Sequence, residues 1–497
     1  MGDYIDNFNV AAKGRFCYSF VPAVEAKRNA LESFEKEYGL QAAQRLASAM
    51  KIFEGRVRWM LIFWMLVISA VSFLDRVNIS IAGPSIEREF HLDHIQLGWI
   101  FSAWVLGYAL FQAPSGRLAD RFGPRRILFL GTVWWAIFTA LTALAPANIA
   151  ASLAILAVMR FLLGVGESIV YPASNRLVAA WIPSQERGIA NGLIFAGVGL
   201  GAAVTPPLIA YIIYHHGWRW SLWTCALIGL VIGGLWFLMA RDEPQHHPWV
   251  SADEALHISA GLPQATTTVE SQALPWRTML GSRNVWVITA SYFGFVYVAY
   301  IFFTWFFTYL SVVRGLNLKA SAGYSMLPFA AMAAGSSLGG WISDRLTRDY
   351  GKRLGRCLAA SAATLVAAVF VGLGTHVGDA RLASVVLAGG AGALYLSQSA
   401  FWSVSSDIGG RSAGSVSGIM NMGGQLGGAT TASLTPFVAK HLGWEMSFWV
   451  AAGFCFLSAA AWLMVNPDQQ LKVTATSNER SNYVELNANS YEEKFLK

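Results

Sequence analysis

Long apolar runs separated by short polar stretches dominate the hydrophobic pattern of this chain of 497 residues. Each run is long enough for a helix to cross a hydrocarbon core of about 30 Å. The chain lacks the ten-residue segments of alternating polarity that are typical of a membrane β-barrel. We therefore expect an all-α membrane protein with twelve transmembrane helices, near residues 58–82, 95–115, 127–146, 149–181, 189–214, 218–240, 284–312, 321–341, 357–376, 381–404, 414–439 and 443–465.

The longest internal polar stretch divides the predicted spans into two sets of six. It is rich in Pro, Ser and Thr, as expected of a linker. The polar N-terminal stretch lacks the continuous apolar core of a signal peptide, and we expect a short amphipathic helix in it, at 23–50. The predicted parts are a cytoplasmic N-terminal extension (1–56), an N-terminal six-helix bundle (57–240), a cytoplasmic linker (241–283), a C-terminal six-helix bundle (284–466) and a cytoplasmic tail (467–497).

An internal repeat supports this division into two half-bundles. Equivalent residues recur in the same order at an offset of 224 to 226 positions, which predicts two parallel copies related by an axis along the membrane normal. Such a duplication is typical of transporters that work by alternating access. The matches are Gly116, Asp120 and Arg121 with Gly340, Asp344 and Arg345, and Gly217-Trp218 with Gly443-Trp444.

Composition and charge agree with a membrane location. Hydrophobic residues make up 55% of the chain and charged residues only 13%, against about 25% charged residues in soluble proteins. The net charge of +7 comes from Lys and Arg gathered in every second loop. This positive-inside pattern places both termini in the cytoplasm, and it explains the basic charge without nucleic-acid binding. The Cys and His residues show no metal-ligand spacing, so we expect no metal.

Four ionisable residues interrupt the predicted spans of the N-terminal half: Asp75, Arg76, Arg160 and Glu167. Charges at membrane depth are costly and normally pair around a polar cavity. Arg160 and Glu167 are two helical turns apart and share a face, as do Asp75 and Asn78. A purely structural pair of ion pairs is the alternative interpretation.

The charges of these four residues predict how a proton and an anion would be coupled. The cluster is neutral when all four are ionised, and protonation of Asp75 and Glu167 leaves Arg76 and Arg160 unopposed. Arginine offers a planar fork that matches a carboxylate. An anion and a proton would then assist each other's binding, as linkage requires. We therefore predict proton-coupling roles for Asp75 and Glu167, with protons as the coupling ion and no cofactor.

The predicted spans of the C-terminal half carry neutral polar groups instead. Ser417, Asn421 and Gln425 recur every four residues and form one polar stripe. Hydroxyl and amide groups of this kind suit a polyol chain, while aromatic residues can stack on a ring; interhelical packing is the alternative role of the stripe. The residues predicted to bind substrate are Arg76, Arg160, Asn78, Tyr108, Tyr300, Gln398, Ser399, Asn421 and Gln425.

The segment Gly116–Arg126, GRLADRFGPRR, resembles the signature loop of the major facilitator superfamily. Its glycine permits close approach of helices, and Asp120 suits a helix N-terminus or an arginine. We predict that this loop and its repeat latch the cytoplasmic gate through Gly116, Asp120, Arg121, Asp344 and Arg345.

Further motifs resemble the anion:cation symporter family of that superfamily, over about 57–466. They include Asp75-Arg76-x-Asn78, Arg160 with Glu167, and Glu186-Arg187-Gly188. The resemblance implies carriers of sugar acids such as galactonate, glucarate and hexuronates, with Tyr108, Gln398 and Asn421 near the substrate. The chain departs from the family at Phe73, where sugar-acid carriers can have tyrosine, and at Phe307, which replaces a frequent proline.

These observations predict a monomeric, multi-pass carrier in a bacterial inner membrane. Its expected activity is proton-coupled import of an organic anion, with a sugar acid as the first choice, by rocker-switch alternating access. The alternatives are a carrier of aromatic or short aliphatic carboxylates, an exchanger or antiporter without proton coupling, and an anion sensor. No Ser–His or metal-ligand pair indicates an enzyme. Membrane lipid and the small anion are the expected partners.

Overall fold

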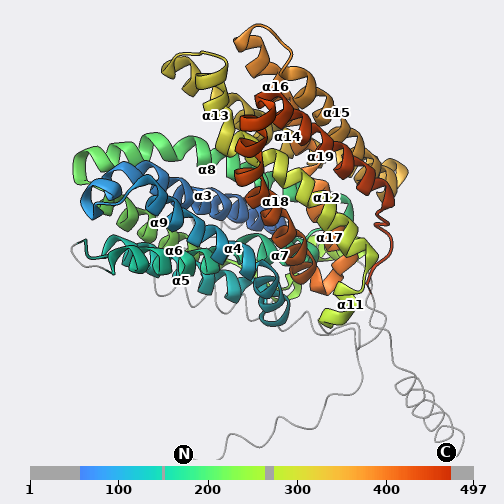
Figure 1. Cartoon of the computed structure of the whole chain (residues 1–497). Coiled ribbons are helices and arrows are strands. Elements are labelled where there is room, and N and C mark those ends of the chain that lie inside the picture. The colour runs from blue at the N-terminus through green and yellow to red at the C-terminus, as the bar shows by residue number, and fades with distance from the viewer. Residues whose placement is uncertain (1–55, 148–150, 263–273, 472–497) are drawn as a thin grey trace, which may run out of the picture. The chain divides into compact units, whose positions relative to one another are not determined.

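The computed structural model describes residues 56–147, 151–262 and 274–471, and every regular element in them is helical. The described residues from Arg58 to Pro248 and from Ala252 onward form one compact unit (Figure 1). Val57 and Trp249–Ser251 belong to a second unit. The expected amphipathic helix at 23–50 lies outside the described residues.

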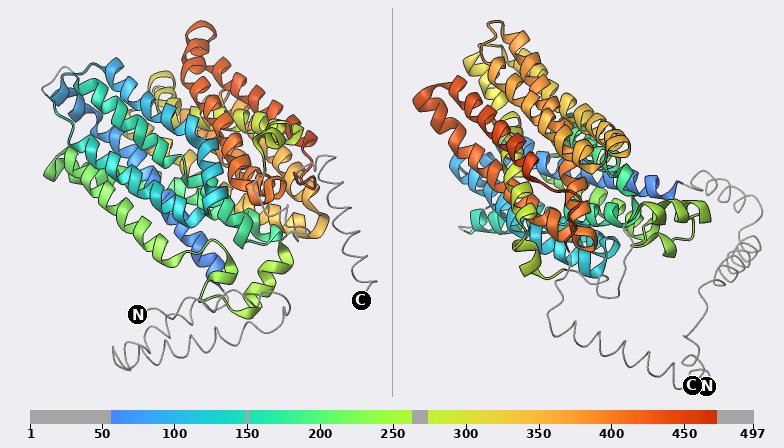
Figure 2. Two further views of the ribbon diagram at one scale, coloured as in Figure 1. Left: turned by 90° about the horizontal axis from the view of Figure 1, so that it is seen from below. Right: turned by 90° about the vertical axis from the view of Figure 1, so that its right-hand side faces the viewer.

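The helices of the first set correspond to the six predicted spans of the N-terminal half, the fourth of which is divided in two, and they lie together in both views of Figure 2. Gly217, with φ of 88°, separates the last two of them, and the repeat-related Gly443, with φ of 91°, does the same in the second set. The repeat in the sequence is therefore a repeat in the backbone. The helices are α3 (Val57–Phe90), α4 (His94–Phe122), α5 (Pro124–Ala143), α6 (Ser152–Glu167), α7 (Val170–Trp181), α8 (Arg187–His216) and α9 (Trp218–Met239), with the 3₁₀ turn η1 (Ser184–Glu186) before α8.

The second set contains more interruptions. Its first helix, α12, continues through two π-helical segments, which flank Phe307, the residue that replaces a proline frequent in the family. The elements are α12 (Arg283–Tyr300), η4 (Ile301–Trp305), α13 (Phe306–Thr308), η5 (Tyr309–Val313), α14 (Leu318–Tyr350), η6 (Arg353–Leu358), α15 (Ala359–Gly374), α16 (Ala380–Leu396), α17 (Gln398–Gly409), η7 (Gly410–Ser412), α18 (Ala413–Leu442) and α19 (Trp444–Met464).

Nine helical segments among the described residues are long and apolar enough to cross a membrane. One of them, Ala380–Leu442, contains α16 to α18, for which the sequence predicts two spans. Two further predicted spans correspond to α4 and α14, which have 29 and 33 residues. Their many small and polar residues lower their mean hydropathy. The count of twelve spans therefore stays a prediction.

The linker contains η2 (Pro244–His246), α10 (Ala252–Gly261) and α11 (Trp276–Leu280). Of these, α10 contacts the first set of helices. Arg58 of α3 forms ion pairs with Glu254 of α10 at 3.3 Å and with Glu186 of η1 at 3.0 Å. We call the helix ends near these elements the linker side, which the charge pattern predicts to be cytoplasmic.

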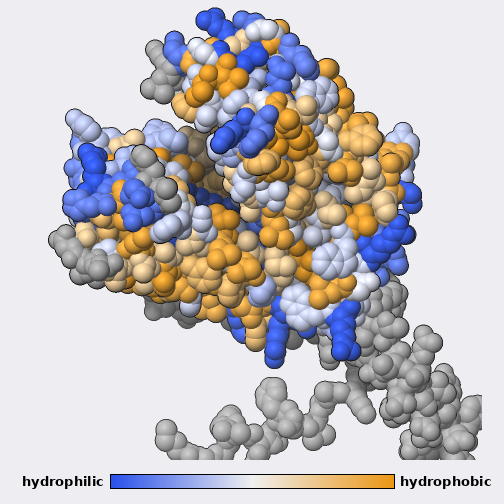
Figure 3. Space-filling view, in the orientation of Figure 1, coloured by the Kyte–Doolittle hydropathy of each residue, from blue (hydrophilic) through white to orange (hydrophobic). Residues whose placement is uncertain are grey.

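The two most extensive contacts between the two sets are related by the repeat. α4 packs against α18, and α14 packs against α8. Since α14 is the copy of α4 and α18 the copy of α8, the two contacts are the same contact made twice. The surface is hollowed where α8 faces the segment around α13 (Figure 3).

Candidate functional site: a buried charge cluster and a latch

The centre of the N-terminal half contains a buried ion pair between α3 and α6. Arg76 Nε donates to Glu167 Oε2 at 3.0 Å. The Glu167 side chain is fully buried, and that of Arg76 is 13% exposed. Arg76 Nη2 and Glu167 Oε1 have no hydrogen-bond partner among the described residues. Each member of the pair therefore keeps hydrogen-bonding capacity for another group.

Aromatic rings surround the Arg76 guanidinium. Its Cζ atom lies 4.3 Å from the ring centroid of Tyr108 and 4.8 Å from those of Trp104 and Phe73. Trp104 and Tyr108, one turn apart on α4, are stacked with centroids 5.1 Å apart. Such cation–π contacts hold a guanidinium in place and strengthen when water is excluded. We call Phe73, Trp104, Tyr108 and Tyr171, the last at 6.0 Å, the aromatic cage.

Asp75 and Arg160 complete the cluster without a direct hydrogen bond to each other. Asp75 is 1% exposed and Arg160 is 2% exposed. Neither carboxylate oxygen of Asp75, nor Nε and Nη1 of Arg160, has a hydrogen-bond partner in the described part of the chain. Both residues interact electrostatically with Glu167. The structure therefore brings together the four ionisable residues singled out in the sequence.

Asn78 lies apart from this cluster in its contacts. Its amide nitrogen donates to Cys225 Sγ at 3.1 Å, and its amide oxygen accepts from Ser221 Oγ at 2.8 Å. Both partners are on α9, so the Asn78 side chain joins α3 to α9. Substrate binding by Asn78 stays a prediction, and these contacts give it a packing role.

The polar stripe of the C-terminal half forms a chain of hydrogen bonds that reaches α4. Tyr300 OH donates to Gln425 Oε1 at 2.9 Å, and Gln425 Nε2 donates to Asn421 Oδ1 at 3.4 Å. Asn421 Nδ2 then donates to Gln112 Oε1 at 2.9 Å. Sequence reasoning missed Gln112, because a single amide at the end of an apolar run carries little signal.

Gln398 and Ser399 lie at the start of α17, and their side chains make no hydrogen bond to that chain among the described residues. Gln398 Nε2 donates to the Tyr292 hydroxyl at 3.3 Å. Gln398 Oε1 and Ser399 Oγ are buried and have no hydrogen-bond partner among the residues described. They offer an acceptor and a hydroxyl to a ligand.

On the linker side, two aspartates cap helices of the opposite half. Asp120 of α4 accepts from the backbone nitrogens of Gly414 at 3.0 Å and Ser415 at 2.7 Å, at the start of α18. Asp344 of α14 does the same for Gly188 at 2.8 Å and Ile189 at 2.6 Å, at the start of α8. Carboxylates are favourable at helix N-termini. These bonds, together with Asp407 and its partners described next, form the linker-side latch.

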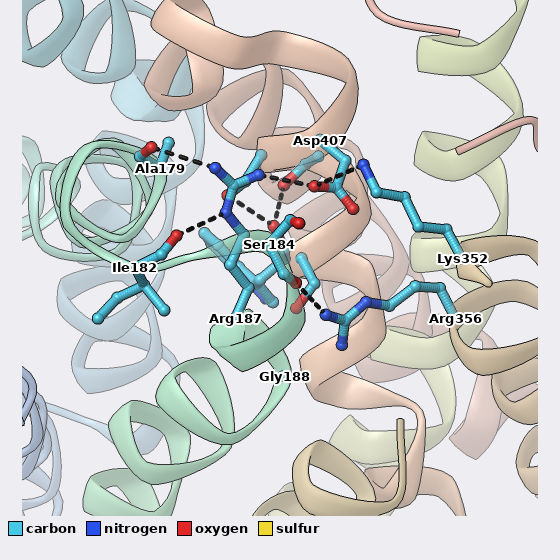
Figure 4. Close-up of polar contacts among 12 residues, drawn as sticks. Ala179, Ile182, Ser184, Arg187, Gly188, Lys352, Arg356 and Asp407 are labelled. Carbon is cyan, nitrogen blue, oxygen red and sulfur yellow. Dashed lines mark hydrogen bonds and ion pairs between the residues drawn. The ribbon is translucent and has the colours of Figure 1, made fainter. Parts of the chain in front are cut away.

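Asp407 of α17 is the centre of a second part of the latch (Figure 4). It accepts from Arg187 Nη1 at 2.6 Å and lies 3.3 Å from Lys352 Nζ. Arg187 is 1% exposed, and its other donors bond the carbonyl oxygens of Ala179 and Ile182. The Arg187–Asp407 pair thus joins the two halves in a buried setting.

The structure does not bring Arg121 and Arg345 into the latch. Both are exposed, and each guanidinium lies beside a ring of its own helix, Phe122 and Trp341 respectively. Arg356, which pairs with Asp344 at 2.6 Å, and Arg176, 3.9 Å from Asp120, stand in their place. Long cationic side chains at a helix end reach water easily, so a motif does not determine which arginine turns inward.

A profile of the Major Facilitator Superfamily matches residues 65–432 and 413–490. The chain belongs to this superfamily. Among its relatives, the probable sulfoacetate transporter SauU of Cupriavidus necator is 32% identical over 414 residues, covering 83% of this chain and 94% of the relative. The hexuronate transporter of Bacillus subtilis is 28% identical, covering 82% and 94%. The resemblance to anion carriers of the superfamily is thereby confirmed.

A solved structure of the superfamily shows the same fold. The proton:xylose symporter XylE aligns with a TM-score of 0.64 at 15% identity, covering 82% of this chain and 97% of that one. The profile match and the transporters among its relatives show that the chain is an integral, multi-pass membrane transporter of the major facilitator superfamily, and not an enzyme. No group of three His, Cys, Asp or Glu side chains in the described residues could hold a metal ion.

The close approach of α4 to α18 at Gly116 predicts that a larger residue there opens the linker side. A Cβ atom at Gly116 would overlap the backbone oxygen of Gly414. Gly116→Ala should therefore destabilise the closed linker side by about 1–3 kcal/mol, a factor of about 5–150 in population. The measurement is maleimide labelling of a cysteine introduced at Val416, which is fully buried between the halves. Labelling should speed up by that factor.

Gly98→Ala is the matched control for Gly116→Ala. Gly98 lies on the same helix, α4, and nothing lies within 4 Å of a Cβ atom built there. Its labelling rate should equal that of the parent chain with Val416→Cys alone. Equal rates for both glycine variants would contradict the role of the α4–α18 contact in closure.

Proposed function

We propose that the chain is a proton-coupled symporter that imports an organic anion, with a sugar acid as the first choice of substrate. The observation that carries the proposal is the buried cluster of two arginines and two carboxylates. Among the described residues, Arg160 and Asp75 keep unpartnered polar atoms there. Arg76 and Glu167 form a direct ion pair, in which an anion could replace Glu167 as the partner of Arg76. Relatives named as transporters of hexuronate and of galactarate or D-glucarate support the substrate class.

The coupling follows from the charge balance of the cluster. An anion that bonds Arg76 Nη2 and Arg160 competes with Glu167 for the positive charge. The displaced carboxylate then favours its protonated form, because a lone buried carboxylate is unfavourable. Proton binding in turn leaves the arginines without a counter-charge and favours the anion, as linkage requires. The empty cluster is neutral, and so is the cluster carrying one monovalent anion and one proton.

The latch supports alternating access in this proposal. In the structure the linker side is closed by bonds between the halves, while the surface is hollowed beside α8 (Figure 3). With the linker side in the cytoplasm, as the charge pattern predicts, the site would load from outside. Breaking the latch and closing the hollow would then release anion and proton inward. We also propose that the carrier is a monomer in a bacterial inner membrane.

The test is uptake into proteoliposomes that contain the full chain. Labelled glucuronate, galactarate, sulfoacetate and benzoate are offered with and without an inward proton gradient. Accumulation of one acid that requires the gradient supports the proposal and identifies the substrate class. Exchange in preloaded vesicles without gradient-driven accumulation would contradict proton coupling.

A second candidate substrate class is an aromatic or short aliphatic carboxylate. It is favoured by an apolar wall that continues from the aromatic cage. The ring centroid of Phe73 lies 6.5 Å from that of Phe303, which lies 5.2 Å from that of Phe329. A small apolar pocket beside this wall is lined by α8, η4, α14 and α16. Preference for benzoate over glucuronate in the uptake assay would select this candidate.

Arg160→Lys gives a prediction on binding. The planar fork of Arg160 has two unpartnered nitrogens, whereas an ammonium offers a single point of charge. We expect the apparent affinity for the transported acid to fall by at least about ten-fold, the effect of losing one charge-assisted hydrogen bond. Concentration dependence of exchange measures it, and unchanged affinity would remove Arg160 from the site.

A further inference from the structure

The hydrogen-bond chain of the C-terminal half ends in an unused donor. Tyr300, Gln425 and Asn421 each donate to the next member, and Asn421 donates to Gln112 Oε1. Gln112 is fully buried, yet its Nε2 has no hydrogen-bond partner in the described residues. Leaving a buried N–H unpaired is costly, so such a group normally has a partner that binds at another time.

The position of Gln112 relates this donor to the anion site. Trp104, Tyr108 and Gln112 are spaced four residues apart on α4 and therefore follow one face of the helix. The first two belong to the aromatic cage around Arg76. Gln112 thus lies one helical turn, about 6 Å, below the cage, on the way to Gly116 and the latch.

The unpaired acceptors around this site are carboxylate oxygens of Asp75 and Glu167, which a proton can satisfy. The unpaired donors include Arg76 Nη2, Arg160 Nε and Gln112 Nε2. A ligand that satisfies them must present several acceptor oxygens together, as a carboxylate or a sulfonate does. The amide chain behind Gln112 is aligned donor to acceptor, and this alignment polarises the terminal N–H.

We propose that Gln112 is a further anion-binding residue, whose Nε2 donates to the substrate while its Oε1 holds Asn421 of the other half. This inference rests on the proposed function and deepens it. The Gln112 side chain thus contacts both the anion bound in the N-terminal half and Asn421 in the polar stripe of the C-terminal half. When α4 and α18 separate, the bond to Asn421 breaks, so the anion loses a donor that the closed linker side keeps aligned. Gln112 therefore makes the affinity for the anion depend on whether the linker side is closed or open.

The donor role is tested with a pair of isosteric substitutions. Gln112→Glu replaces the donor by an acceptor but still accepts from Asn421. Gln96→Glu adds the same charge to the same helix, α4, away from the residues predicted to bind substrate, and its side chain still accepts from the backbone nitrogen of Asp93. The assay is binding of labelled glucuronate, galactarate and sulfoacetate to the purified full chain. We expect Gln112→Glu to weaken the binding of each acid that the wild type binds by at least about ten-fold, and Gln96→Glu to weaken it by less than about three-fold.

Two outcomes of this comparison overturn the proposal. Equal weakening by both variants would mean that added charge, and not the lost donor, acts on the anion. Unchanged binding by Gln112→Glu would remove the residue from the site. If the wild type binds none of the three acids, the proposed function fails for them and the donor role fails with it.

The bridge to Asn421 is tested without any substrate. Thermal unfolding is measured for Gln112→Leu, Asn421→Leu and the double variant. The losses in unfolding temperature should not add, because each single substitution already breaks the same bond. Additive losses would contradict the bridge, whatever the binding assay shows.

Discussion

Replacing Glu167 by Gln is expected to abolish proton-driven accumulation while exchange of anion for anion continues. Gln keeps an oxygen that can accept from Arg76 Nε, the bond that spans 3.0 Å in the wild type, so the site keeps its shape. It cannot gain or lose a proton, and the link between proton and anion is cut. Substrate inside proteoliposomes should then rise only to the outside concentration, whatever the proton gradient.

Glu89→Gln is the matched control for Glu167→Gln. Glu89 pairs with Arg219 and bonds Trp218 at 2.7 Å, far along α3 from the cluster, and its side chain is 37% exposed. We expect both accumulation and exchange to persist in this variant. Equal loss of both modes in Glu167→Gln would show that Glu167 is needed for binding or folding rather than for the proton.

Replacing Arg187 by Gln is expected to open the linker side. Removing one partner of a buried ion pair typically costs about 3–5 kcal/mol, because the other charge stays buried. Among the described residues, Lys352, at 3.3 Å, would be the one cation left beside Asp407. Since the pair joins the two halves, the loss falls on the closed state, and its population should drop by two orders of magnitude or more. Labelling of the Val416→Cys variant should accelerate by at least about ten-fold.

Arg121→Gln provides the comparison for Arg187→Gln. The two substitutions remove the same charge from the same side of the protein, but Arg121 is exposed and has no ion pair with any residue that the structure describes. Its labelling rate should match that of the parent chain. Faster labelling in Arg121→Gln than in Arg187→Gln would restore Arg121 to the gate, as the loop motif had predicted.

The helical spans and their arrangement in two repeated sets could be predicted, because they follow from long apolar runs and from an internal repeat in the sequence. A repeat of Gly116 and Asp120 at Gly340 and Asp344 predicts that α4 and α14 are equivalent, and both aspartates do cap a helix of the other half. The break between α6 and α7 was not predicted, nor were the π-helical segments after α12. Such local deviations depend on packing against neighbouring helices and leave no strong pattern in one sequence.

The site was predictable where its residues are unusual for their surroundings. Asp75, Arg160 and Glu167 stand out because a charge within an apolar run is rare. Trp104 and Gln112 were not predicted, because an aromatic ring or a single amide is common in a membrane helix and gives no distinct sequence signal.

The latch was harder to predict, for a related reason. Arg187 and Asp407 lie at the ends of apolar runs, where charges are expected, so only the fold shows that they meet. The motif Glu186-Arg187-Gly188 contains Arg187, but the motif alone does not indicate a role at the gate.

The aromatic cage has a consequence for how a substrate is oriented. Rings occupy the space around the Arg76 guanidinium, Nε donates to Glu167, and Nη2 is buried without a hydrogen-bond partner among the described residues. A carboxylate that docks there must lie in the plane of the guanidinium, which also sets the direction of the carbon chain behind it. In a sulfonate, the carbon lies outside the plane of the sulfur and the two oxygens that face the guanidinium, so its carbon chain must leave that plane. The arginine therefore sets different chain directions for planar and for tetrahedral head groups.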